Sequence, residues 1–123
     1  MVDDCHNCKH IIQYKEYHGI KKITSIINTW VFPNSSNDLL IKSKKHLCEI
    51  CGRSRSRHRI HICVFCSFRA CFSHGHIKQH FRSHHKHVFA IELSQGFLYC
   101  FQCRDYVFDQ EVSTGVFTIR NHF

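Results

Sequence analysis

Cysteine pairs with the spacing of metal ligands occur three times between residues 48 and 103. The pairs are Cys48-x2-Cys51, Cys63-x2-Cys66 and Cys100-x2-Cys103. A tight Cys-x2-Cys turn aims two sulfur atoms at one point about 2.3 Å away, which is the zinc–sulfur distance. A single pair also occurs in redox motifs, but three pairs in so short a span predict structural zinc sites.

Histidines fill the interval between the second and third pairs, at positions 74, 76, 80, 84, 85 and 87. So many histidines are rarely a core feature, and we expect at least two to be ligands. His76 and His80 lie on a predicted helix over residues 74–86, where four residues span about 6 Å along the axis. This separation favours two neighbouring zinc ions over one shared tetrahedral site.

The N-terminus carries a further group of four such residues: Cys5, His6, Cys8 and His10. The third Cys pair otherwise lacks two ligands, so we expect this segment to complete its site. Spacing alone leaves the choice between Cys8 with His10 and Cys5 with His6 open.

Length, hydrophobic content and cysteine count limit the classes of protein to which the chain can belong. The 123 residues, 43% of them hydrophobic, suffice for one domain with a small core, to which a structural zinc ion adds about 10–16 kcal/mol of apparent folding energy. Disulfides are the alternative for nine cysteines. The odd count, the closeness of the pairs and a polar N-terminus without a signal-peptide pattern favour zinc and a reducing compartment. No apolar run approaches the roughly 18 residues of a membrane span.

The formal net charge of +8 suggests an acidic partner. With eight thiolates bound to three zinc ions the charge falls to about +6, which weakens the argument for nucleic acid. Four arginines, Arg53, Arg55, Arg57 and Arg59, alternate with Ser or His. They suit a phosphate-binding strip, but we favour a solvated loop tip, because no aromatic residue is interleaved to stack on bases.

The elements that position these side chains follow from hydrophobic periodicity. An apolar stripe at spacings of three and four predicts a helix over 19–32, followed by a loop over 33–38 and a short strand or helical turn at 39–41. For residues 112–123 we expect either a last strand over 116–119 or an unstructured end. Strands are predicted over 60–64, 68–72, 88–93, 97–100 and 106–108.

With its ligands in order, the sequence resembles the zinc finger of ubiquitin-specific proteases, the ZnF-UBP domain, over residues 8–109. The resemblance begins at Cys8-Lys9-His10-Ile11 and continues through the first two Cys pairs. It then follows Cys71-x4-His76-x3-His80, and it ends with Tyr99-Cys100-Phe101-Gln102-Cys103-Arg104-Asp105-Tyr106-Val107. Within the family the sequence resembles the N-terminal finger of the SAGA-complex deubiquitinase.

The resemblance implies an α+β fold, a twisted antiparallel sheet flanked by helices, with three interleaved zinc sites. It also implies a domain over residues 8–109, between a tail at 1–7 and an extension at 110–123. The interval from His80 to the last histidine is one residue longer than expected, so His85 is an alternative to His87. We keep His87 because it directly precedes a strand. The implied ligand sets are Cys8, His10, Cys100 and Cys103; Cys48, Cys51, Cys71 and His76; and Cys63, Cys66, His80 and His87.

Members of the family that bind ubiquitin hold its free Gly-Gly tail with an Arg, a Trp and a Tyr. In this sequence the Arg position is Ser73, the Gly before it is Phe72, and Tyr99 replaces the Trp; Tyr106 is present. Loss of the charge-assisted hydrogen bond costs about 1.5–3 kcal/mol. We therefore expect weak or no binding of the ubiquitin tail.

The resemblance implies an assembly module that docks a deubiquitinase onto adaptor proteins. It implies a location in the nucleus, or in both the nucleus and the cytoplasm. A ubiquitin-tail receptor is one alternative. A nucleic-acid-binding finger is another, because Cys63-x2-Cys66-x13-His80-x3-His84 is one residue from the C2H2 spacing. We expect no catalysis by this chain alone, since it is too short for a papain-like domain and only Cys5 is unassigned. The sequence leaves open whether the chain is a fragment of a larger enzyme, the identity of the partner and the role of Cys5.

Overall fold

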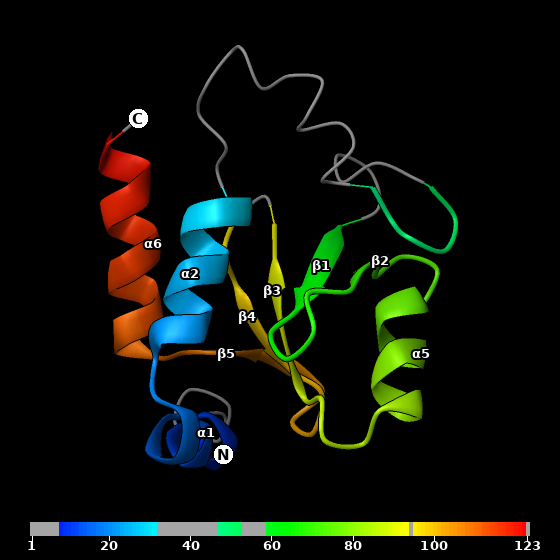
Figure 1. Ribbon diagram of the computed structural model, residues 1–123, viewed down its shortest axis with the longest axis horizontal. Coiled ribbons are helices and arrows are strands. Elements are labelled where there is room, and N and C mark those ends of the chain that lie inside the picture. Colours follow the sequence, from blue (N-terminus) through cyan, green and yellow to red (C-terminus); the bar gives the residue numbers. More distant parts are fainter. Residues whose placement is uncertain (1–7, 32–46, 53–58, 94, 123) are drawn as a thin grey trace.

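A computed structural model describes residues 8–31, 47–52, 59–93 and 95–122, with side chains described as far as residue 116 (Figure 1). It contains a five-stranded antiparallel sheet flanked by helices, which confirms the predicted α+β fold. The predicted loop at 33–38, the element at 39–41, Cys5 and three of the four alternating arginines lie outside the described residues.

The sheet has the strand order β2-β1-β3-β4-β5. Its strands are β1 (Ile60–Cys63), β2 (Arg69–Cys71), β3 (Phe89–Glu92), β4 (Leu98–Cys100) and β5 (Asp105–Val107). All five fall within or beside the predicted strands, and every pair of neighbours is antiparallel. Two of the three Cys pairs begin at the last residue of a strand, Cys63 in β1 and Cys100 in β4, so the sheet fixes their relative positions.

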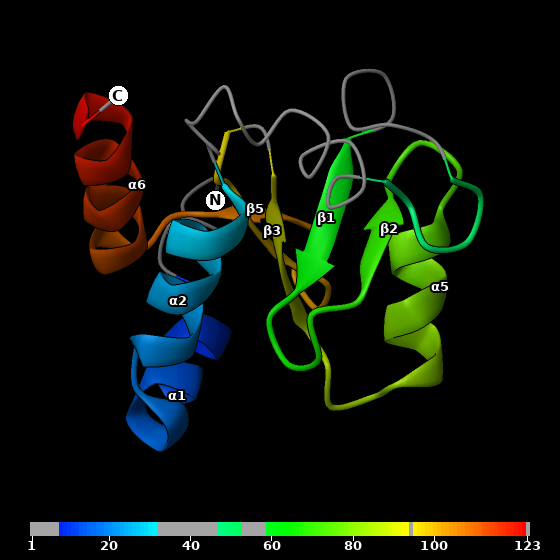
Figure 2. The same ribbon diagram turned by 45° about the horizontal axis from the view of Figure 1, so that its top comes forward.

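The described helices are α1 (Lys9–His18), α2 (Lys21–Trp30), α5 (His76–Ser83) and α6 (Gln110–His122). Two views place α2 and α6 together on one side of the sheet and α5 beside β2 on the other (Figures 1 and 2). Helices α2 and α5 confirm the predicted helices over 19–32 and 74–86. No helix in the described part of the chain has the length and apolar character needed to cross a membrane.

The two faces of the sheet carry different side chains. One face packs on α1 and α2, through a Tyr14–Phe89 edge-to-face contact of 5.6 Å and the Arg69 guanidinium 5.0 Å from the Trp30 ring. The opposite face carries His61, Tyr99 and Tyr106, which register places on the same side. Because β1 and β3 are buried at every residue, both faces belong to the core.

Helix α1 has no counterpart among the predicted elements. Ile11 and Tyr14 are its buried residues, three positions apart on one face. Its Lys15 ammonium lies 2.8 Å from a carboxylate oxygen of Asp109 and 2.7 Å from one of Glu111. The first helix is thereby joined to the start of the last one.

The prediction of a strand over 116–119 or an unstructured end is wrong, because residues 110–122 form α6. The run Val116-Phe117-Thr118-Ile119 consists of β-branched and aromatic residues, which favour strands. Tertiary packing overrides that preference, since α6 packs against α2. Asp109 caps the helix, its carboxylate accepting a hydrogen bond of 3.2 Å from the backbone N–H of Val112.

Candidate metal centres

Three clusters of four Cys and His side chains have the donor atoms of each cluster within 4.8 Å of one another. The members are Cys8, His10, Cys100 and Cys103; Cys48, Cys51, Cys71 and His76; and Cys63, Cys66, His80 and His87. The structure thus brings together the twelve side chains named from the sequence, in the implied groups. The assignment of each one as a zinc ligand stays a prediction.

The donor separations fit tetrahedral zinc. Zinc–ligand distances of about 2.3 Å to sulfur and about 2.0 Å to nitrogen imply edges of about 3.8 Å between two sulfurs and about 3.5 Å between sulfur and nitrogen. Two nitrogens should be about 3.3 Å apart. The sulfurs of Cys51 and Cys71 are 3.8 Å apart, Cys63 Sγ and His87 Nδ1 are 3.5 Å apart, and the facing nitrogens of His80 and His87 are 3.4 Å apart.

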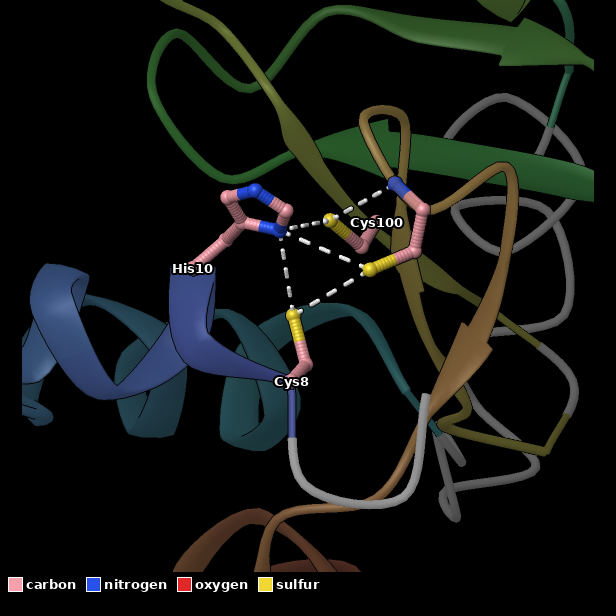
Figure 3. Close-up of side chains that lie close together, drawn as sticks. Cys8, His10 and Cys100 are labelled. Atoms are coloured by element: carbon pink, nitrogen blue, oxygen red, sulfur yellow. Dashed lines mark hydrogen bonds between the residues drawn. The ribbon is translucent and has the colours of Figure 1, made fainter. Parts of the chain in front are cut away.

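The first cluster ties the start of α1 to the end of β4 (Figure 3). The Nδ1 atom of His10 lies 3.5 Å from the sulfurs of Cys8, Cys100 and Cys103. The sulfurs of Cys8 and Cys103 are 3.6 Å apart. Cys8 and His10 therefore face the third Cys pair, and the alternative pair, Cys5 and His6, lies outside the described residues.

The second and third clusters share helix α5, which begins at His76 and carries His80 one turn later. Nδ1 of His76 lies 3.4 Å from Cys48 Sγ and 3.2 Å from Cys71 Sγ. Nε2 of His80 lies 3.3 Å from Cys66 Sγ. His76 and His80 thus lie in two different clusters, and their roles as ligands of two different zinc ions stay a prediction.

All three Cys-x2-Cys pairs form the same backbone turn. In each, the first Cys carbonyl accepts a 2.8 Å hydrogen bond from the N–H of the residue that follows the second Cys. That residue has a positive φ: 75° at Gly52, 65° at Ser67 and 61° at Arg104. Only the first turn uses glycine, which adopts this conformation without steric cost.

Burial makes the cysteine clusters dependent on a cation. It raises the pKa of the Cys63 thiol to about 12 and that of Cys71 to about 11. Burial also lowers the pKa of His80 and His87, with nearby histidines as a further cause. Neutral imidazoles are the form that binds metal, and zinc converts coordinating thiols to thiolates.

Other histidines lie near the clusters without belonging to them. Nδ1 of His84 donates a hydrogen bond of 3.1 Å to the His80 carbonyl oxygen, and the third cluster contains His87 instead. The C2H2-like set with His84 is therefore not the one that the structure assembles, and His85 is also outside the cluster. The eight described cysteines, which exclude Cys5, are free of disulfides.

A buried histidine outside the metal clusters was missed by the sequence analysis. His61, in β1, has none of its surface exposed. Its Nδ1 donates to the carbonyl oxygen of Arg59 at 2.9 Å, and its Nε2 lies 2.9 Å from the Tyr106 hydroxyl. The apolar character of β1 could have signalled it, since a strand that is buried on both faces also buries the polar residue between Ile60 and Ile62.

A small α+β domain whose helices and strands are joined by three interleaved Cys/His clusters defines a class of zinc-stabilised fingers. Residues 48–112, more than half of the chain, match the family model described as "Zn-finger in ubiquitin-hydrolases and other protein". The chain therefore belongs to this ZnF-UBP family, as its resemblance implied. The family and the clusters together confirm zinc as the cofactor, with three clusters in the described part of the chain.

Similar proteins include ubiquitin carboxyl-terminal hydrolase 22 of Bos taurus, 33% identical over 105 residues, or 85% of this chain and 20% of the relative. Probable ubiquitin carboxyl-terminal hydrolase 8 of Schizosaccharomyces pombe is 32% identical over 98% of this chain and 24% of the relative. The chain thus spans about a fifth to a quarter of the length of these relatives.

The fold is similar to solved structures of the SAGA Ubp8/Sgf11/Sus1/Sgf73 DUB module. One such structure superposes with a TM-score of 0.68 at 21% identity, over 90% of this chain and 26% of the other. The module bound to monoubiquitin superposes with a TM-score of 0.70 at 22% identity, over 92% of this chain and 26% of the other. At these identities the similarity establishes the fold.

Proposed function

We propose that this domain is a nuclear assembly module that docks a SAGA-type deubiquitinase onto adaptor proteins, and that it binds the ubiquitin tail weakly or not at all. Relatives that are ubiquitin carboxyl-terminal hydrolases, and a similar fold within a module that contains Sgf11, Sus1 and Sgf73, support this proposal. A nuclear location follows from the proposed complex, and a cytoplasmic pool remains compatible with it.

One observation carries the second half of the proposal. Phe72 replaces the glycine beside which the ubiquitin tail lies in tail-binding relatives, and its ring contacts the aromatic residues that would flank that tail. The Phe72 ring centroid is 5.3 Å from that of His61 and 5.5 Å from that of Tyr99. Tyr99 is in turn 5.4 Å from Tyr106. The aromatic side chains therefore pack on one another and leave little space for a peptide.

The charge of the site also opposes tail binding. Ser73 is exposed and short, so it cannot supply the guanidinium that pairs with a terminal carboxylate. A hydrogen bond to a charged group contributes about 1.5–3 kcal/mol, which corresponds to roughly 10- to 150-fold in affinity. Steric filling by Phe72 adds to this loss.

Co-expression tests docking. The 123-residue chain, tagged, is produced with adaptors of the Sgf11, Sus1 and Sgf73 type, and stoichiometric co-purification is expected. A Cys63→Ser, Cys66→Ser variant, deprived of one zinc cluster, is the matched control that should lose the adaptors. Folded, zinc-loaded chain that fails to co-purify with them would overturn the docking proposal.

Calorimetry tests tail binding. Ubiquitin is titrated into the zinc-loaded chain, with ubiquitin lacking its Gly-Gly tail as the control. No heat beyond that of the control is expected at micromolar concentrations. Tail-dependent micromolar affinity would instead establish the alternative function, that of a ubiquitin-tail receptor.

Catalysis is not part of the proposed function of this chain. The eight described cysteines all belong to the three clusters, so among the described residues none is available as a nucleophile. Any hydrolase activity would require a further domain, as in the relatives that are four to five times longer.

A further inference from the structure

Two cations from different elements meet at one aromatic ring. The guanidinium carbon of Arg59, just before β1, lies 4.3 Å from the centroid of the Phe72 ring. The ammonium of Lys78, in α5, lies 4.6 Å from the same centroid. The two positive groups are therefore no more than about 9 Å apart, and each gains a cation–π interaction.

Neither cation has an ionic partner in the described structure. The ion pairs of the described residues use Lys15 and Arg69 instead. A buried carboxylate that the strand register places on this face, that of Glu92, accepts a hydrogen bond of 2.6 Å from the backbone N–H of Gln95. Arg59 is exposed and Lys78 is half-buried, so both charges are open to an external anion.

The backbone holds the two sides of this surface in place. The N–H of Phe72 donates to the Arg59 carbonyl oxygen at 3.1 Å, and the Phe72 carbonyl oxygen accepts from Gly75 at 2.9 Å. His61 donates to the same Arg59 carbonyl oxygen. A site whose ring and cations are fixed in advance loses less conformational entropy on binding.

From this arrangement we propose that Arg59, Phe72 and Lys78 bind an acidic segment of a partner protein. Side chains two residues apart on an extended segment are separated by about 7 Å, which lies within the upper limit that the two ring contacts set for the separation of the cations. One carboxylate pairs with the guanidinium, whose N–H donors lie in its plane, and another with the ammonium. The proposal rests on the assembly function and names the chemistry of one partner contact.

An acidic peptide fits this surface better than nucleic acid. Binding of single strands depends on base stacking on aromatic rings. Here the Phe72 ring is already covered by two cations and contacts His61 and Tyr99, so a base would have to displace one of these groups. Carboxylates can reach both cations without moving the ring.

The test is a titration of the isotope-labelled, zinc-loaded 123-residue chain, followed by NMR. The probe is an eight-residue peptide of alternating Glu and Ser, acetylated and amidated so that it has no terminal carboxylate and cannot mimic a ubiquitin tail. Saturable shifts centred on Arg59, Phe72 and Lys78 are expected. Shifts spread over the whole basic surface, or none, would overturn the proposal without affecting the test of adaptor docking.

Matched variants distinguish binding at a defined site from nonspecific attraction of the peptide to a basic domain. Arg59→Gln with Lys78→Gln should weaken peptide binding at least tenfold. Lys21→Gln with Lys22→Gln removes the same charge from the exposed start of α2 and should change it less than twofold. Equal losses in both variants contradict a defined site, and so does tighter binding of a single-stranded oligonucleotide to the same three residues. Native mass spectrometry checks that each variant binds three zinc ions. If a variant loses metal, the NMR shifts of the wild-type chain alone decide whether the peptide binds at Arg59, Phe72 and Lys78.

Discussion

The Nε2 atom of His61 lies 2.9 Å from the hydroxyl oxygen of Tyr106, which joins β1 to β5 although two strands separate them in the sheet. Burial lowers the pKa of His61 to about 4 and raises that of Tyr106 to about 12. At neutral pH the imidazole is therefore neutral and the phenol protonated. Because Nδ1 donates to Arg59, Nε2 accepts the Tyr106 hydrogen.

Tyr106→Phe should lower the free energy of unfolding by about 1–3 kcal/mol, the cost of leaving a buried acceptor without a donor. The measurement is chemical denaturation with saturating zinc, so that metal loss does not contribute. Tyr17→Phe, at a side chain that is 86% exposed, is the control and should change stability little. Equal stability of the Tyr106→Phe variant and the wild type would show that the hydrogen bond contributes nothing.

Zinc counting distinguishes the two candidates for the last ligand of the third site. Native mass spectrometry of the wild-type chain should find three zinc ions. His87→Asn should bind two tightly, because Nδ1 of His87 faces Cys63 at 3.5 Å, whereas His85→Asn should keep three. The reverse pattern would assign the site to His85.

The shared turn of the three Cys pairs predicts which positions favour glycine. A left-handed residue other than glycine costs about 1–2 kcal/mol, part of which is offset by the greater entropy of glycine in the unfolded chain. Arg104→Gly should therefore raise the free energy of unfolding by about 0.5–1 kcal/mol in excess zinc, and Gly52→Ala should lower it. If Arg104→Gly destabilises the domain, the side chain of Arg104 makes a contact that outweighs its φ of 61°.

Local signals predicted the parts of the molecule that depend on spacing and periodicity. Two sulfurs in a Cys-x2-Cys turn must point the same way, and two of the pairs correctly marked the ends of β1 and β4. The placement of His76 and His80 on one face of a helix, one turn apart, followed from helical geometry. The grouping of pairs into three sites came from the family resemblance, because spacing alone left Cys5 and His6 as an alternative to Cys8 and His10.

The parts that were missed depend on long-range contacts. Helix α1 has a weak apolar stripe, and its position comes from the first metal cluster and from Lys15, which reaches Asp109 and Glu111 across the chain. Residues 116–119 have the composition of a strand and form a helix because α2 offers a packing surface. His61 is polar within an apolar strand, and its partner Tyr106 is 45 residues away.

Packing of α6 can be tested at a single glycine. Gly96 has a φ of 79°, and a Cβ atom there would lie 2.7 Å from Cγ2 of Val116 in α6. Gly96→Ala should lower the free energy of unfolding by about 2–4 kcal/mol, combining backbone strain with overpacking. Gly52→Ala has a similar φ and nothing within 4 Å of the new atom, so it isolates the backbone cost. Equal losses in both variants would show that α6 does not pack on Gly96 in solution.

The proposed loss of ubiquitin-tail binding can be tested by reversing the two substitutions. Phe72→Gly combined with Ser73→Arg restores the small residue and the guanidinium of tail-binding relatives, leaving Tyr99 and Tyr106 to flank the peptide. The arginine should contribute about 1.5–3 kcal/mol to the affinity for a free carboxylate, so calorimetry should detect binding of ubiquitin where the wild type shows none. Ubiquitin without its Gly-Gly tail should give no heat with the same variant. Should the folded, zinc-loaded double variant fail to bind, Phe72 and Ser73 are not what excludes the tail, and the Tyr99 position, where relatives carry Trp, is the next to be reversed.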